Sequence, residues 1–310
     1  MKSLDFITHD SEMLCGIISK DFSEKEANFN LIGTPLDITS TYRPGSRMGP
    51  NSFRNILYSD NFECVTESGV DLRKHYRVKD HGNIGIIPTN LSKSLHFISE
   101  GVSEFLKSSI PFLVIGGDHS TSIGVAKAFE ENSHSFYLVY LDAHLDLYDN
   151  VMEDPNSHAC TLRRITEKPT FQGATVLGYR DFSVDQIKYA EKVGLDIIST
   201  DNLVKVPNLY NFGFQKAKTL ISKYPRIYVS LDLDLLDPGV APGVGNPVAG
   251  GISSRQLFWM IQGLFKGLGR SHLIGWDIVE YNPIYDQSEI TAFLMIKLLI
   301  EGLGSLLSMD

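Results

Sequence analysis

The chain is poor in cysteine. Cys15, Cys64 and Cys160 are its only three cysteines, they are far apart, and no two of them form a Cys-x-x-Cys pair. This excludes a disulfide framework and a zinc ribbon, and it is typical of proteins from a reducing compartment. The sequence also lacks an apolar run of the roughly 18 residues that a membrane helix needs, and its start lacks the apolar segment of a signal peptide. We therefore expect a soluble, cytoplasmic protein.

Positive charge is scarce as well. Lys and Arg number 28 against 37 Asp and Glu, which gives a formal net charge of −9 without a basic tract. This composition argues against nucleic-acid and membrane partners, and we expect neither. Gly116-Gly117 and Gly243-Val244-Gly245 lack the spacing of a dinucleotide fingerprint, and the chain has no P-loop. An acidic surface instead suits a small cationic substrate.

Apolar runs of strand length recur along the chain. They are Leu31–Ile32, Ile84–Ile87, Phe112–Ile115, Phe136–Leu141, Thr175–Leu177, Asp196–Ile198, Ile227–Leu231 and Leu273–Ile278. Most are continuous rather than alternating, which predicts strands that are covered on both faces.

Amphipathic stretches lie between most of these runs, near residues 94–107, 121–131, 184–193, 212–223, 254–267 and 288–308. Ser253-Ser254-Arg255-Gln256 resembles a capping box at the start of one of them. This alternation predicts an α/β fold with a mostly parallel sheet and helices on both faces. Because no linker or repeat interrupts the pattern, we predict one domain over residues 1–310, with residues 1–28 as a peripheral extension.

Acidic and histidine side chains follow three of the predicted strands. They are His119, Asp142, His144, Asp146, Asp232 and Asp234. In extended chain the alternating ligands of each block point to one face, and the carboxyl ends of parallel strands share one edge. Six ligands are too many for one ion that keeps an open position, but they suit two ions, roughly 3.5–4 Å apart, that share a water. The mixture of carboxylates and imidazoles suits Mn²⁺ better than a metal that prefers thiolates.

The blocks that carry these residues resemble those of a known family. Gly116–Ser120, Asp142–Asp146 and Ser230–Asp237 resemble the three signature blocks of the ureohydrolases, which include arginases and agmatinases. Asp277–Pro283 resembles a fourth block, and Ser40–Pro50 resembles the family's N-terminal loop. The resemblance implies a three-layer α/β/α sandwich around an eight-stranded, mostly parallel sheet. It also implies two Mn²⁺ per subunit and a homotrimer or homohexamer.

The resemblance further implies a role for each ligand. The first Mn²⁺ would be bound by His119 and Asp146, the second by His144 and Asp234, and both by bridging Asp142 and Asp232. Glu280 would hold the guanidinium group, because a carboxylate accepts two parallel N–H bonds from that fork. His158 matches a proton-shuttling histidine of the family, so Asp146 or His158 would protonate the leaving amine. Asp118 and Asp237 are expected to support turns.

The loop from Leu147 to Arg164 bears on the substrate. Tyr148, two residues after Asp146, resembles agmatinases rather than arginases, and so does the Arg163-Arg164 pair that follows His158. These features favour agmatine, whose hydrolysis to urea and putrescine is a step of polyamine biosynthesis. Tyr148 and Asn156 are then candidate substrate contacts, although Asn156, like Asp181, also resembles arginases, and we favour interpreting both as ordinary loop residues.

Other interpretations of the substrate and of the function stay open at this point. Arginine, 4-guanidinobutyrate or formimidoylglutamate could be the substrate, with Arg163, Arg164 or Arg180 as the partner of a substrate carboxylate. A dinuclear phosphoesterase would need a basic or glycine-rich phosphate cradle, and a non-catalytic binding protein would be expected to have lost ligands. Pro238–Pro247 is either an active-site wall or an ordinary loop, and Arg43 and Arg47 are interpreted as structural.

Overall fold

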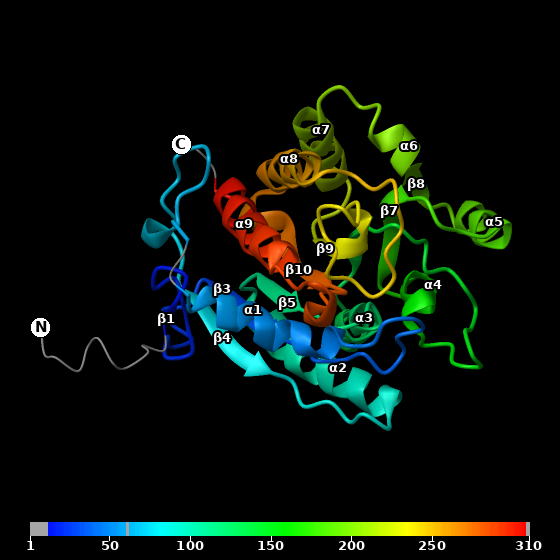
Figure 1. The fold of residues 1–310 in the computed structure, drawn as a ribbon, viewed down its shortest axis with the longest axis horizontal. Helices are drawn as coiled ribbons and strands as arrows, with labels where there is room; N and C mark the ends of the chain where they lie inside the picture. The colour runs from blue at the N-terminus through cyan, green and yellow to red at the C-terminus, as the bar shows by residue number, and fades with distance from the viewer. Residues whose placement is uncertain (1–11, 60–61, 308–310) are drawn as a thin grey trace, which may run out of the picture.

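The computed structural model describes residues 12–59 and 62–307 (Figure 1). The predicted extension, residues 1–28, lies partly outside these ranges. The sheet contains, in spatial order, β1 (Glu12–Met13), β2 (Ile18–Ser19), β4 (Val78–Asn83), β3 (Phe29–Gly33), β5 (Phe112–Ile115), β10 (Leu273–Val279), β9 (Ile227–Asp232), β6 (Phe136–Leu141), β7 (Phe171–Tyr179) and β8 (Asp196–Ser199).

The strands are parallel except for the pairing of β1 with β2. The eight strands from β4 to β8 in this order correspond to the predicted parallel sheet. The short strands β1 and β2, from the segment predicted to be peripheral, extend it at one edge, so the sheet has ten strands rather than eight.

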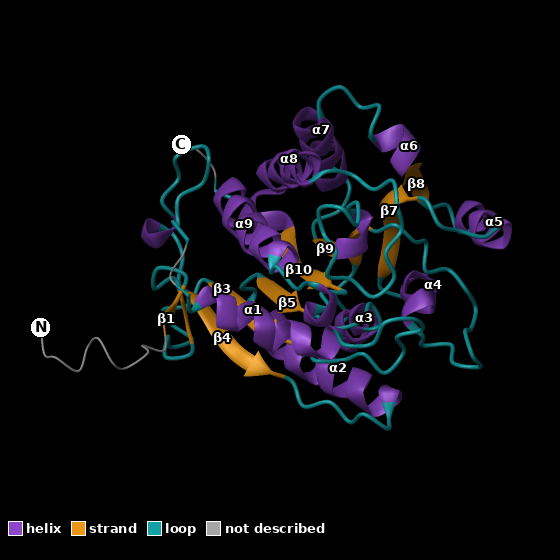
Figure 2. Ribbon diagram, viewed as in Figure 1, coloured by secondary structure: helices purple, strands orange, loops and turns teal. Residues whose placement is uncertain are grey.

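Helices cover both faces of the sheet (Figure 2). They are α1 (Gly49–Leu57), α2 (Leu91–Ser108), α3 (Thr121–Glu131), α4 (Thr161–Thr166), α5 (Val184–Lys192), α6 (Thr200–Leu203), α7 (Leu209–Ile221), α8 (Ser254–His272) and α9 (Ile290–Ser305). One hydrophobic cluster joins the sheet to α1, α7, α8 and α9, and a second joins it to α2, α3, α4 and α5. None of the helices in the described ranges is long and apolar enough to cross a membrane.

The continuous apolar runs of the strands follow from the helices that cover both faces of the sheet. In β5, Phe112 and Val114 belong to the cluster under α2 and α3, whereas Leu113 and Ile115 belong to the cluster under α8 and α9. Successive side chains point to opposite faces, so a strand between two helical layers is apolar at every position. The prediction of covered strands and of the α/β/α sandwich is confirmed.

One predicted strand is wrong. Residues 84–87 form neither helix nor strand, and the strand of this region is β4, which ends at Asn83. The apolar pattern misses β4 because Asp80 lies within it, buried against Arg54 of α1. Two hydrogen bonds of 2.8 Å join the Arg54 guanidinium to the Asp80 carboxylate, and this pairing makes the buried charges tolerable.

Candidate metal centre

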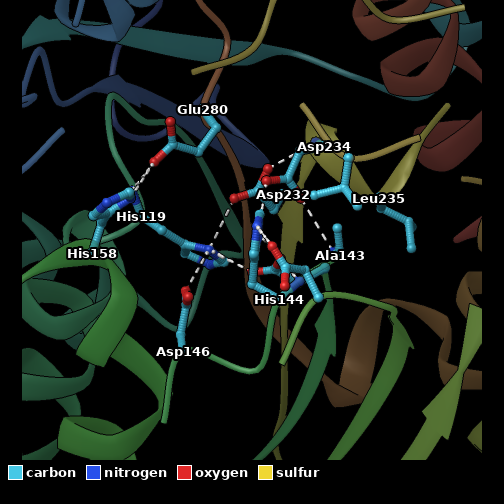
Figure 3. Close-up of polar contacts among 12 residues, drawn as sticks. His119, Ala143, His144, Asp146, His158, Asp232, Asp234, Leu235 and Glu280 are labelled. Carbon is cyan, nitrogen blue, oxygen red and sulfur yellow. Dashed lines mark hydrogen bonds and ion pairs between the residues drawn. The ribbon is translucent and has the colours of Figure 1, made fainter. Parts of the chain in front are cut away.

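The six candidate ligands meet at the carboxyl ends of β5, β6 and β9 (Figure 3). His119 lies between β5 and α3, Asp142 directly follows β6, and Asp232 is the last residue of β9. Glu280 follows β10, the strand between β5 and β9. Four adjacent strands therefore deliver all these side chains to one edge of the sheet, as the sequence predicts.

Short polar turns aim the carboxylates inward. Asp232 Oδ1 accepts a hydrogen bond of 2.8 Å from the Asp234 N–H, and Asp142 Oδ1 accepts one of 2.6 Å from the His144 N–H. The Ala143 N–H donates to Asp234 Oδ1 at 3.1 Å. Asp232 and Asp234 each use one oxygen for these backbone contacts and keep the second for the centre, whereas both oxygens of Asp142 lie beside the histidines.

The first group of ligand atoms surrounds His119. Its Nδ1 lies 3.0 Å from Asp142 Oδ2 and 3.1 Å from Asp232 Oδ2. Asp146 Oδ2 lies 3.4 Å from the same nitrogen. His119, Asp142 and Asp146 each place a donor atom within 4.8 Å of the others, which is close enough to hold one ion.

The second group surrounds His144. Its Nδ1 lies 3.0 Å from Asp234 Oδ2 and 3.4 Å from Asp142 Oδ1. These three residues form the second set whose donor atoms lie within 4.8 Å of one another. Asp142 belongs to both sets and offers a different oxygen to each, so its carboxylate is placed to bridge two ions.

The chemistry of the donor set fits divalent cations. Asp142 Oδ2 is buried and has no hydrogen-bond partner among the described residues, although it lies beside His119. Burial and the neighbouring carboxylates raise the pKa of Asp232 well above its usual value, and burial with Asp142 raises the pKa of Asp146 to about 7. Buried carboxylates that repel one another are stabilised by a shared cation, and oxygen with imidazole nitrogen suits a hard or intermediate metal.

A hydrogen-bonded chain beneath the centre orients His119. His119 Nε2 lies 2.9 Å from Ser230 Oγ, and the Ser230 hydroxyl donates to Asp277 Oδ1 at 2.7 Å. Asp277 also accepts hydrogen bonds of 2.6 Å from the hydroxyls of Ser122 and Tyr228. Since the Ser230 proton points to Asp277, its oxygen accepts from His119 Nε2–H, which leaves Nδ1 unprotonated and able to bind a metal, with the Tyr140 hydroxyl 3.0 Å away.

His158 and Glu280 face each other beside the ligands. His158 Nδ1 lies 3.4 Å from Glu280 Oε1, which also accepts a 3.0 Å hydrogen bond from the His119 N–H (Figure 3). Burial lowers the pKa of His158, but Glu280 outweighs it and raises that pKa to about 9. Glu280 and Asp146 have φ angles of 65° and 47°, in the left-handed region that non-glycine residues seldom adopt. Such strained backbone is often found at functional sites.

The N-terminal loop covers this pair. Asp118 Oδ2 accepts hydrogen bonds from the Thr39 N–H at 3.0 Å and the Thr39 hydroxyl at 2.9 Å. Thr39 Oγ1 in turn accepts from the His158 N–H at 2.9 Å, and Thr41 Oγ1 lies 3.2 Å from His158 Nε2. Asp118 therefore supports a loop, as expected. Local sequence pattern does not single out Thr39 or Thr41, because their partner His158 lies 119 and 117 positions along the chain.

A cavity of about 320 Å³ opens onto the ligands. Five carboxylates line it, and no Lys or Arg does so among the described residues; the carboxylates are Asp146, Asp181, Asp232, Asp234 and Glu280. Thr41 and Tyr42 line another part of the cavity, as do Asn246 and Pro247 at the end of the Gly- and Pro-rich stretch. The end of this stretch therefore forms part of the cavity wall. The negative lining suits a cationic ligand.

Two candidate substrate contacts do not line this cavity. Neither Tyr148 nor Asn156 is among the residues that line it. The Tyr148 N–H donates to the carbonyl of Ala159, a residue of the lining, while the tyrosine side chain is exposed. The Asn156 N–H donates to Asp154 Oδ1, within a local turn. The wall next to the ligands comes instead from the N-terminal loop and from the end of the Gly- and Pro-rich stretch, which the sequence left open between an active-site wall and an ordinary loop.

The arginines considered as partners of a substrate carboxylate are occupied elsewhere. Arg163 and Arg164 pair with Asp149 and Glu167 on the surface. Arg47 pairs with Asp37, as expected for a structural residue.

Arg43 also stays close to its own loop. Its guanidinium lies 5.1 Å from the centroid of the Tyr42 ring and 4.6 Å from that of the Tyr285 ring. These contacts agree with the interpretation of Arg43 as structural, and they leave it outside the cavity lining.

Arg180 joins three segments through backbone carbonyls. Its guanidinium makes seven hydrogen bonds, to the carbonyls of Gly178, Asp234, Leu235, Leu236, Val248 and Ala249. The shortest run to Val248 and Asp234, at 2.6 and 2.7 Å. Arg180 therefore connects the turn that carries Asp234 to the cavity wall at Val248.

Comparison with known proteins agrees with this geometry. A family model described as the arginase family matches residues 27–304. An agmatinase of Bacillus cereus is 30% identical over 285 residues, which cover 91% of this chain and 92% of that protein. Proclavaminate amidinohydrolase of Streptomyces clavuligerus is 29% identical over 86% of this chain and 84% of its own length.

A solved structure shows the same fold. The agmatine ureohydrolase of Thermoplasma volcanium superposes with a TM-score of 0.80 at 26% identity, over 99% of this chain and 97% of that one. The likeness therefore extends over nearly the whole chain and includes the four strands that carry the centre.

Proposed function

The chain belongs to the arginase family, hydrolases that act on the C–N bonds of guanidino groups, and we propose that its substrate is agmatine, cleaved to putrescine and urea. The observation that carries the proposal is that the cavity lining offers no Lys or Arg among the described residues, whereas Glu280 and Asp181 are lining carboxylates outside the proposed ligand set. Agmatine has a cation at each end and no carboxylate. Arginine, 4-guanidinobutyrate and formimidoylglutamate each carry a carboxylate that this lining would repel.

We propose that the centre holds two Mn²⁺. His119 and Asp146 would bind the first, His144 and Asp234 the second, and Asp142 and Asp232 would bridge them. The placement of Asp142 in both ligand sets supports this division. Such a pair of ions supplies Lewis acidity and makes water nucleophilic near neutral pH. The oxygen and nitrogen donors, together with the family, favour manganese among the divalent metals.

Glu280 would hold the guanidinium group of the substrate. Its carboxylate is 3% exposed, lines the cavity and has no Lys or Arg partner among the described residues. A guanidinium offers two parallel N–H bonds to such a carboxylate, which orients its carbon toward the centre. Asp181, at the more exposed part of the lining, is placed to attract the ammonium end.

His158 would protonate the leaving amine. An amide anion is too basic to leave near neutral pH, so a proton must reach the nitrogen as the C–N bond breaks. The His158 pKa of about 9 keeps the imidazole protonated at neutral pH, and Thr41 contacts its Nε2. Asp146 is the alternative donor, but its carboxylate is committed to the ligand set.

A substrate panel tests the proposal. Urea release by the manganese-loaded protein is measured with agmatine, arginine and 4-guanidinobutyrate. Formamide release is measured with formimidoylglutamic acid. Agmatine should have the highest kcat/KM. In Glu280→Gln, kcat/KM should fall about 10- to 100-fold, as expected for losing hydrogen bonds to a charged group. A higher kcat/KM for any of the other three compounds would show that the substrate assignment is wrong.

A further inference from the structure

A second cavity lies at the opposite end of the strands that carry the metal centre. It has a volume of about 410 Å³. Ile110, His134, Arg226 and His272 line it, and they lie shortly before β5, β6, β9 and β10. Because these four strands are parallel neighbours, their amino ends form one edge of the sheet and their carboxyl ends form the other. The length of the sheet therefore separates this cavity from the metal centre.

The charge of this second cavity is opposite to that of the first. Arg226 and Arg270 line it together with His134 and His272, and no Asp or Glu does so among the described residues. The whole chain carries a net charge of −9. A cavity lined by two guanidinium groups without a carboxylate is thus an exception on an acidic protein, and it attracts anions.

Several polar groups in this cavity lack partners within the described ranges. The Arg226 guanidinium makes no hydrogen bond or ion pair there. His134 Nδ1 is buried and has no hydrogen-bond partner in the same part of the structure. Arg270 uses Nη2 for the Asn28 carbonyl, at 2.7 Å, and packs over a tyrosine ring without an acidic partner. The exposed Arg226 guanidinium is therefore available to a ligand, as are the Arg270 nitrogens other than Nη2.

The remaining wall is apolar. Phe105, Leu106 and Leu273 are buried and line the cavity together with Ile110 and Pro225. We propose that this cavity binds a small organic anion that carries a phosphate group on an apolar body. The phosphate pairs with the guanidinium groups of Arg226 and Arg270, because the planar fork of arginine matches phosphate oxygens. The apolar body packs against the phenylalanine and leucine side chains.

Phenyl phosphate is a suitable probe, with benzyl alcohol as the neutral compound of similar shape. Binding to the manganese-loaded protein is measured by isothermal titration calorimetry. Phenyl phosphate should bind and benzyl alcohol should not. In the double variant Arg226→Gln with Arg270→Gln, affinity should fall at least about tenfold, as expected for losing charged hydrogen bonds. Lys192→Gln, which removes an exposed cation of α5, is the matched control and should bind like the wild type.

The variants separate this cavity from the metal centre, where phosphate could also bind. If the wild type and the double variant bind phenyl phosphate with equal affinity, the phosphate binds elsewhere and the proposal is overturned. So would no binding to the wild type up to about 10 mM, or equal binding of benzyl alcohol. If the double variant does not fold, Arg226→Gln alone carries the test, since this side chain has no partner within the described ranges. Urea release should stay unchanged in Arg226→Gln.

Discussion

Ser230 and Asp277 are paired directly across β9 and β10, and the Ser230 hydroxyl donates to the Asp277 carboxylate at 2.7 Å. The same hydroxyl accepts from His119 Nε2–H, so the register of two strands fixes the tautomer of a candidate metal ligand. Replacement of Ser230 leaves two buried polar groups without their partner.

Ser230→Ala should therefore weaken metal binding. Loss of a group that orients a ligating histidine typically costs about 10- to 100-fold in metal affinity. We expect a loss of this size for manganese, measured by titration of the metal-free protein. Ser94→Ala removes another buried serine hydroxyl, at the start of α2, and is the matched control. Unchanged manganese affinity in Ser230→Ala would contradict the role of the hydrogen-bonded chain.

Arg180→Lys should loosen both the Asp234 turn and the wall at Val248. A lysine ammonium has three donors on one nitrogen and cannot span six carbonyls as the guanidinium does. We expect the free energy of unfolding to fall by about 2–3 kcal/mol, because several charged hydrogen bonds are lost. KM should rise more than kcat falls. Urea denaturation and urea-release kinetics measure these effects, and Arg73→Lys, at an exposed ion pair with Asp71, should change either by little.

His158 makes stability depend on pH. Its pKa is raised from the usual 6.5 to about 9 because Glu280 outweighs burial. The folded chain then keeps a proton that the unfolded chain releases, so the stabilisation is complete below about pH 6.5 and is lost as pH rises through about 9. Between about pH 7 and pH 9.5, unfolding free energy should fall faster in the metal-free wild type than in His158→Gln. Parallel curves from urea denaturation would disprove the assignment.

Asp80→Asn should destabilise the fold without affecting the metal centre. The change leaves the buried Arg54 guanidinium without its charged partner, and breaking a buried ion pair in this way costs about 3–5 kcal/mol. Urea denaturation should show this loss, whereas manganese content per folded molecule should stay constant. Glu104→Gln, which removes an exposed partner of Lys107, should cost less than about 1 kcal/mol. If both variants lose a similar free energy of unfolding, burial does not make the Asp80–Arg54 pair more important for stability than an exposed pair.

The sequence predicts best those features that depend on local pattern. The continuous runs at β5, β6 and β9 are apolar because both faces are covered, and each begins and ends where predicted within one residue. Ser253 caps α8 with a complete capping box, in which Gln256 returns the hydrogen bond, as its spacing indicates. The convergence of the six ligands follows from the parallel arrangement alone.

Features that depend on distant contacts are not visible in local pattern. The strand β4 is hidden because the partner of Asp80 lies 26 positions earlier. Thr41 reaches the site because its loop folds back onto His158, 117 positions along the chain. Tyr148, only two residues from the candidate ligand Asp146, has an exposed side chain and does not line the cavity. Closeness in sequence to a ligand is therefore a weak guide to the cavity wall.

In the proposed two-ion centre, the presence of Asp142 in both ligand sets would keep the two metal positions from filling independently. An ion that occupies one of them withdraws negative charge from the carboxylate that the other needs. The second ion would then bind more weakly than the first, which is negative cooperativity. Over a range of metal concentration the protein would accumulate as a singly loaded species, and activity would rise as a shallow rather than a sigmoidal function of the metal supplied.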